Sequence, residues 1–189
     1  TSHSEPMDNH TLYVIPARGG SKGIPGKNIK PLGGRPLIHY TIDIARQLAP
    51  DSHIIVSTDS EEIASVARQT GLPVDYMRPA ELATDTSGSR EVIIDAMDWA
   101  AGRGIAFDRV VLLQPTSPLR TVADVEACLE RYTPDADMVV SVIPAKSNPY
   151  YNCFETDCAT GLLHISKGSG LYVRRQDAPE AWEYSGSVY

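Results

Sequence analysis

Short apolar runs alternate along the chain with segments whose apolar residues repeat at a helical spacing. The apolar runs predict five strands, TLYVIP (11–16), HIIVST (53–58), PVDYM (73–77), RVVLLQ (109–114) and DMVVSVI (137–143). Four helices are predicted between them, at residues 36–48, 60–70, 89–101 and 121–132. Strands that are apolar throughout are typical of a parallel sheet buried on both faces. The pattern therefore predicts an α/β fold, a Rossmann-like three-layer α/β/α sandwich with a mostly parallel sheet.

Polar residues and glycines mark the expected ends of the helices. Ser60 is predicted to cap the second helix and Gly71 to stop it, and Ser89 and Gly102 are expected to do the same for the third. Thr121 precedes the fourth helix with an acid three residues on, which predicts a variant of the capping box.

The alternation ends after residue 145, where Pro, Tyr and Gly become frequent. We expect a small β-arm or lid in this C-terminal third. The first ten residues, TSHSEPMDNH, are polar and aperiodic, so residues 1–10 are predicted to be a disordered tail. Residues 11–189 are then expected to form a single domain, which is long enough to bury a core.

Charge and composition exclude several classes of protein. A net charge of −7 argues against a nucleic-acid binder, which needs a broad basic face. No apolar run approaches about 20 residues and no leader pattern opens the chain, so we expect a cytoplasmic protein that does not enter a membrane. Three cysteines do not make a disulfide framework, and the pair Cys153 and Cys158 lacks the second pair of a zinc site.

The stretch IPARGGSKGIPGKNIKPLGGRPLI (15–38) gathers six glycines and five cations directly after the first predicted strand. Its spacing fits neither the phosphate-binding P-loop nor the dinucleotide fingerprint. Glycines let backbone N–H groups approach an anion, and lysine and arginine add charge, so the loop indicates a polyphosphate site, the alternative being a solvated turn. Ligands collect beyond the carboxyl ends of parallel strands, which predicts that loops 17–30, 57–60 and 114–120 lie together.

This stretch closely resembles the signature of the N-acylneuraminate (sialic acid) cytidylyltransferases, the CMP-nonulosonic acid synthetase family. The resemblance extends over almost the whole chain, through VSTDSEEIA (56–64), RPAELATDTSGS (78–89), LLQPTSPLR (112–120) and RRQDAPEAWEYSGSVY (174–189). It implies an enzyme that transfers CMP from CTP to the anomeric hydroxyl of an acidic nine-carbon sugar for bacterial surface polysaccharide. It also implies a Mg²⁺ cofactor and a homodimer.

The resemblance further implies a role for each matching residue. Lys27 and Arg18 would be catalytic, with Lys27 on the α-phosphate. The implied nucleotide-binding residues are Ala17, Arg18, Gly19, Ser21, Lys22, Lys27, Asn28, Arg78, Ser87 and Ser89. The implied sugar-binding residues are Gln114, Thr116, Ser117 and Arg175.

Some roles stay open from the sequence. Arg78 could instead brace its loop, Gln114 could satisfy backbone groups at a strand end, and Asp59 could be a helix cap or a ligand contact. The run NPYYN (148–152) could be a dimer contact or a platform for the sugar.

The chain also departs from the family pattern. Family members usually carry an Asp-x-Asp pair, which holds magnesium, beyond the strand that SGSVY (185–189) begins. Asp135 and Asp137 match that string ahead of a different strand, so we expect that a C-terminal segment is missing and the metal ligands stay unknown. Glu183 and Ser185 stand where sialate members show Arg and Asn, which leaves the sugar open. The alternatives are a 3-deoxy-manno-octulosonate or legionaminic-type acid nucleotidylyltransferase and a catalytically silent nucleotide-sugar binding module.

Overall fold

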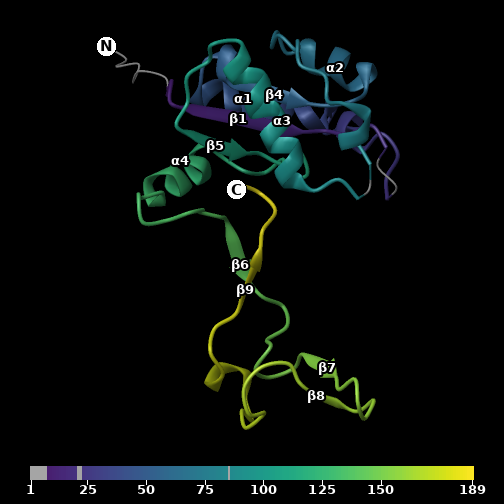
Figure 1. Cartoon of the computed structure of the whole chain (residues 1–189), viewed down its shortest axis with the longest axis vertical. Coiled ribbons are helices and arrows are strands. Elements are labelled where there is room, and N and C mark those ends of the chain that lie inside the picture. Colours follow the sequence, from purple (N-terminus) through teal and green to yellow (C-terminus); the bar gives the residue numbers. More distant parts are fainter. Residues whose placement is uncertain (1–7, 21–22, 85) are drawn as a thin grey trace. The chain divides into compact units, whose positions relative to one another are not determined.

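A computed structural model describes residues 8–20, 23–84 and 86–189 (Figure 1). Contacts within the chain divide it into two compact units. The first is formed by Thr1–Val140 and Gly186–Tyr189, and the second by Ser141–Ser185. The division falls close to residue 145, where the alternating sequence pattern ends.

The first unit is built on a parallel sheet with β1 (Thr11–Pro16) at its centre. β4 (Ile54–Ser57) and β5 (Arg109–Leu112) pair with it on either side, in the order β4-β1-β5. Tyr13 lies opposite Ile54 of β4 and Val111 of β5. After the glycine-rich loop (residues 17–30), β2 (Pro31–Leu32) and β3 (Arg35–Pro36) form a separate small hairpin. The predicted parallel sheet is confirmed.

Helices cover both faces of this sheet (Figure 1). α1 (Leu37–Leu48), α2 (Glu61–Arg68) and α4 (Val122–Arg131) share one buried cluster with Tyr13 and Ile15 of β1. α3 (Ser89–Gly102) packs in a second cluster with Leu12 and Val14. Successive side chains of a strand point to opposite faces, so β1 supplies both clusters. The expected three-layer α/β/α arrangement is confirmed.

Two of the three predicted helix starts are confirmed. The Ser60 side chain accepts a hydrogen bond from the Ile63 N–H at 3.4 Å, and Thr121 and Asp124 form both bonds of a capping box. The third is wrong, because Ser89 is the first residue of α3 and Gly88 takes the cap position without a side-chain bond. Gly102, expected to stop this helix, is its last residue.

Two strand predictions are wrong. Residues 73–77 form no ladder among the described residues, and the Val74 carbonyl accepts instead from the Arg68 guanidinium at 2.9 Å. Of the run 137–143, only the last two residues are in a strand, β6 (Val142–Pro144). This run crosses the boundary between the two units, and an apolar run does not reveal which sheet it will join.

The second unit is a small β structure, which confirms the expected β-arm. β6 pairs with β9 (Trp182–Tyr184), and β7 (Phe154–Thr156) with β8 (Leu163–Ile165), both antiparallel. Asn148 is buried and ties the unit together, because its Nδ2 donates to the Pro179 carbonyl at 2.8 Å. The same side chain accepts from the Tyr150 N–H at 2.9 Å. In the described parts of both units, short 3-10 helices lie at Lys27–Ile29, Asp51–His53, Ala80–Leu82 and Arg175–Asp177.

A small polar cluster fixes the segment just before β1. Residues 1–7 of the expected tail lie outside the described residues, whereas Asp8 accepts from the Thr11 hydroxyl at 2.5 Å and from Arg109 at 2.9 Å. Burial alone would raise the pKa of Asp8, but the hydrogen bonds from Thr11, His10 and Arg109 lower it below its usual 3.8. The cluster thus stabilises the fold while Asp8 is ionised.

We expect Asp8→Asn to lower the free energy of unfolding at pH 7 by about 1.5 to 3 kcal/mol, the usual contribution of hydrogen bonds to a charged group. Because the pKa of Asp8 is lowered in the folded state, its contribution is present above pH 3.8 and is lost as the pH falls through the folded-state pKa. Urea unfolding of both proteins at pH 7 and at pH 3 measures the difference. Asp108→Asn is the control, since its carboxylate is 71% exposed; an equal loss in both variants would contradict the role of Asp8.

Candidate active site

A pocket of about 310 Å³ opens at the carboxyl ends of β1 and β5, beside the segment that follows β4. Its described lining residues come from three parts of the chain: the end of β1 with the loop after it, the segment from Arg78 to Val92, and the end of β5 with the residues that follow it. The lining residues are Pro16, Arg18, Lys27, Asn28, Arg78, Leu82, Thr84, Ser87, Ser89, Val92, Leu112, Gln114, Pro115 and Thr116. The expected meeting of the loops after the first strand and after RVVLLQ is confirmed.

The glycine-rich loop is tied to the end of β4 where it leaves β1. The Ala17 N–H donates to the Ser57 carbonyl at 2.8 Å, and the Gly19 N–H donates to Oδ1 of Asp59 at 2.9 Å. A Cβ on Gly19 would lie 3.1 Å from Cβ of Ser60, so this position is tightly packed. Asp59 therefore holds the loop, while Ser60 is the helix cap.

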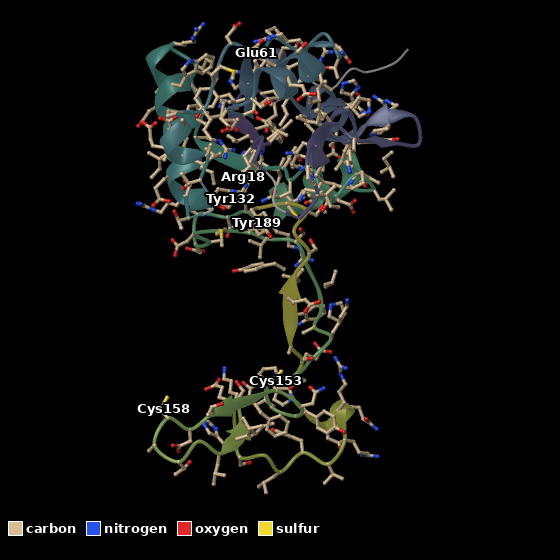
Figure 2. The ribbon with its side chains drawn as sticks, turned by 90° about the vertical axis from the view of Figure 1, so that its right-hand side faces the viewer. Arg18, Glu61, Tyr132, Cys153, Cys158 and Tyr189 are labelled. Atoms are coloured by element: carbon tan, nitrogen blue, oxygen red, sulfur yellow. The ribbon has the colours of Figure 1, made fainter. Side chains whose placement is uncertain are left out.

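The far end of the loop turns back toward the pocket at Gly26, whose φ of 64° is a left-handed conformation that glycine adopts without strain. The 3-10 helix Lys27–Ile29 follows it directly. Asn28 in this helix is buried, and its Nδ2 donates to the Arg18 carbonyl at 3.3 Å. The two ends of the loop are thereby joined, and both Arg18 and Lys27 line the pocket. Figure 2 marks Arg18 in the first unit.

Arg78 lies at the wall of the pocket with only 7% of its surface exposed. Its Nε donates to the Ser57 hydroxyl at 2.9 Å, and its Nη2 to the Ser57 carbonyl at 2.8 Å. Burial lowers the pKa of Arg78, and the nearby Asp59 opposes that change. A guanidinium remains charged through such a change. Arg78 therefore braces its loop against β4 and also presents a cation to the pocket.

The loop after Arg78 is closed by a serine. The Ser87 hydroxyl donates to the Glu81 carbonyl at 3.1 Å and lies 2.7 Å from the Thr84 hydroxyl. Ser87 and Ser89, both predicted to contact the nucleotide, line the pocket. Leu82, Thr84 and Val92 also line it and were not predicted. Leu82 and Thr84 belong to the motif RPAELATDTSGS (78–89), and this motif is the sequence signal that could have identified them as pocket residues.

Gln114 and Thr116 of the predicted sugar-binding set line the same pocket. Ser117 does not, because its hydroxyl donates to the Gly186 carbonyl at 3.2 Å. Arg175 belongs to the second unit, where it donates to the carbonyls of Ala145 and Lys146. Ser21 and Lys22 lie outside the described residues. Ala17 is fully buried beneath the loop, and neither it nor Gly19 lines the pocket.

The charge around the pocket is one-sided. Among its described lining residues three are cations, Arg18, Lys27 and Arg78, and none is an acid. The whole chain carries a net charge of −7, so this concentration of positive charge is local. Such a pocket favours a small ligand with several negative charges.

The part of the chain that the structure describes contains no group of three or more His, Cys, Asp or Glu side chains that could hold a metal ion. Cys153 and Cys158 both lie in the second unit, the first half-buried and the second exposed (Figure 2). The described side chains thus do not fit a magnesium ion held by several carboxylates. Within the same residues, no helix has the length and apolar character needed to cross a bilayer.

The fold and the pocket define an α/β protein with a cation-lined pocket at the carboxyl edge of a parallel sheet. The chain belongs to the cytidylyltransferase family, whose model matches residues 12–183. The family resemblance predicted from the sequence is therefore confirmed.

Individual relatives agree with this membership. A CMP-N,N'-diacetyllegionaminic acid synthase of Legionella pneumophila (strain Philadelphia 1) is 39% identical over 178 residues, which cover 94% of this chain and 76% of that protein. An N-acylneuraminate cytidylyltransferase of Streptococcus agalactiae serotype V is 35% identical over 182 residues, 94% of this chain and 42% of that protein. The solved structure of a CMP:2-keto-3-deoxy-manno-octonic acid synthetase complexed with CTP has a TM-score of 0.60 and 22% identity. It covers 95% of this chain and 73% of that one, and supports the fold alone.

Proposed function

We propose that this protein is a cytidylyltransferase that joins CMP from CTP to the anomeric hydroxyl of an acidic nine-carbon sugar and releases pyrophosphate. The observation that carries the proposal is the pocket at the carboxyl edge of the sheet, lined by three cations and no acid among the described residues. The negative charge of a triphosphate would balance the positive charge of Arg18, Lys27 and Arg78 in this pocket. Membership of the cytidylyltransferase family and the named relatives support the nucleotide and the class of acceptor.

In this reaction the anomeric oxygen forms a bond to the α-phosphorus as the bond to the bridging oxygen breaks. Pyrophosphate leaves with the electron pair, and the hydroxyl proton is lost to a base or to water. Negative charge grows on the α-phosphate and the leaving group. We assign Lys27 to the α-phosphate and Arg18 to the rest of the triphosphate, since fixed cations at such positions lower the barrier.

Six other lining residues are assigned to the nucleotide or to the sugar according to the part of the chain that supplies them. Asn28, Arg78, Ser87 and Ser89 are assigned to the nucleotide, and Gln114 and Thr116 to the sugar. Ser117 and Arg175 stay predictions from the family resemblance, as do Ala17, Gly19, Ser21 and Lys22. A buried donor such as Arg78 makes recognition selective, because a wrong partner leaves a hydrogen bond unmade.

Mg²⁺ also remains a proposal. It commonly keeps several waters and binds the phosphates of a nucleotide substrate, so it would enter with CTP. Since the described side chains form no metal cluster, we assign no step to it. The cytoplasmic location likewise stays a prediction.

The test is a screen for pyrophosphate release with CTP, UTP, ATP and GTP against N-acetylneuraminate, a legionaminic-type acid and 3-deoxy-manno-octulosonate. We expect release only with CTP and a nine-carbon acid. Preference for 3-deoxy-manno-octulosonate would move the acceptor to the eight-carbon class. CTP binding without release for any acid would favour a silent binding module.

We also propose that the protein is a homodimer whose second unit contacts another copy. Of the sixteen exposed large apolar side chains among the described residues, nine lie in this short unit, including Val142, Ile143, Trp182 and Tyr184 of the β6–β9 pair. Two-stranded pairs are marginally stable in water, and this one exposes four large apolar side chains beside a single acid, Glu183. A second copy would cover it, as expected for a patch of this kind.

Replacing Trp182 and Tyr184 together by serine is expected to convert the dimer to a monomer, because both side chains are more than half exposed and would be lost from the contact. Light scattering coupled to size exclusion measures the mass. Ile94→Ser is the control, as Ile94 is an exposed apolar residue of the first unit. A monomeric parent protein would contradict the proposal.

A further inference from the structure

Arg120 is a buried cation directly behind the candidate active site. It ends the motif LLQPTSPLR and has only 6% of its surface exposed. Its Nη2 and Nη1 both donate to the Gln114 carbonyl, at 2.8 and 3.2 Å, and its Nη2 also lies 3.4 Å from the Thr41 hydroxyl of α1. Its Nε is buried without a hydrogen-bond partner. No carboxylate of the described residues forms an ion pair with it.

Such an arrangement is costly for the stability of the fold. A buried charge that forms no ion pair loses its hydration, and the more distant carboxylate of Asp124 offsets this loss only in part. An apolar residue of similar volume is often as stable or more stable at such a place. Burial lowers the pKa of Arg120 to about 10, which reflects the same cost. The Gln114 carbonyl also accepts from the Ser117 N–H at 3.3 Å, so the guanidinium is not needed to satisfy it. Stability alone therefore does not account for Arg120.

The hydrogen bonds of Arg120 explain what the guanidinium does. Two donors on one rigid fork hold a single carbonyl in a fixed orientation more firmly than one donor could. That carbonyl belongs to Gln114, which begins the stretch of pocket wall formed by Gln114, Pro115 and Thr116. The contact to Thr41 ties this stretch to α1.

We propose that Arg120 is a positioning residue that holds Gln114 and Thr116 in place for the acidic sugar. The inference rests on the proposed function for the identity of the ligand. The residues assigned to the nucleotide are anchored elsewhere, since the loop after β1 and Arg78 are both tied to Ser57. Arg120 thus affects the sugar side of the pocket and leaves the nucleotide side unchanged.

The first test is Arg120→Met, which keeps the volume and removes the charge. We expect the KM for the acidic sugar to rise about 10-fold or more, the KM for CTP to change less than about threefold, and the melting temperature to stay the same or rise. Arg120→Lys, which restores one charged donor, should recover part of the loss. In a Gln114→Ala background the effect of Arg120→Met should be smaller, because part of it acts through the Gln114 side chain and coupled residues are not additive.

Arg46→Met is the matched control. Arg46 also donates to a backbone carbonyl, that of Thr70, but it is paired with Asp51 at 2.8 Å and lies away from the pocket. Its loss should lower the melting temperature and leave both KM values unchanged. If Arg120→Met behaves in the same way, or raises both KM values while the protein melts earlier, Arg120 is a structural residue and the inference is wrong.

A second measurement does not depend on turnover. In the unliganded protein, hydrogen exchange in residues 113–120 should be about 10-fold faster in Arg120→Met than in the parent, with exchange in β1 unchanged. Equal exchange in both proteins would overturn the inference even if the enzyme is active. An inactive parent would contradict the proposed function, yet the exchange experiment would still decide whether Arg120 holds the loop.

Discussion

Lys27→Ala is expected to lower kcat by about 100-fold, while CTP binding weakens much less. Lys27 follows the left-handed Gly26 and lines the pocket with Arg18, and it is the cation that we assign to the α-phosphate. A charge that acts mainly in the transition state affects kcat more than substrate binding. Initial rates at saturating sugar give kcat, and calorimetric titration with CTP gives the affinity.

Lys30→Ala is the control for this prediction. Lys30 belongs to the same loop, is exposed, and does not line the pocket. Its replacement should change kcat by less than about threefold. A kcat for Lys27→Ala within the same limit would remove Lys27 from the catalytic residues.

CTP is expected to exceed UTP by about 100-fold in kcat/KM. Cytosine and uracil differ in the donors and acceptors at two neighbouring positions of the ring. A mismatch at a buried site leaves hydrogen bonds unmade at a cost of about 1 to 3 kcal/mol each, and about 1.4 kcal/mol is worth a factor of ten. Rates of pyrophosphate release over a range of CTP and UTP concentrations give the ratio. Equal use of the two nucleotides would contradict the assignment to cytidine.

The loop closed by Ser87 is expected to carry this preference. Ser87→Ala removes the hydroxyl that donates to Glu81 and contacts Thr84, so the CTP to UTP ratio should fall by at least about threefold. Thr86→Ala is the control, because Thr86 is exposed and does not line the pocket. The same fall in both variants would show that the loop acts through its general stability.

The pattern of apolar residues predicted β1 and α4 well, because both elements are specified by residues close together in the sequence. β1 is apolar at every position from Leu12 to Ile15, which marks a strand buried on both faces. The capping box of α4 needs only Thr121 and Asp124 three residues apart, so it could be predicted from the sequence alone. The segment 73–77 alternates exposed and buried residues and includes Asp75, and its Val74 carbonyl accepts from the Arg68 guanidinium, a partner that no local pattern reveals.

The sequence by itself determined the fold class, because the apolar periods of strands and helices are local, and it determined the family through motifs that extend over almost the whole chain. It also identified Arg18, Lys27 and Asn28, which line the pocket. It also determined that the loops after β1 and β5 meet, since parallel strands end at one edge. Only the tertiary structure decided how each residue is used: Asp59 holds Gly19, Arg78 is bonded to Ser57, and Ser117 bonds to Gly186. Arg120 is the clearest case, because arginine is usually exposed, whereas here it is buried with a contact to Thr41 of α1. Contacts between residues far apart in the chain arise from packing, which a linear pattern does not encode.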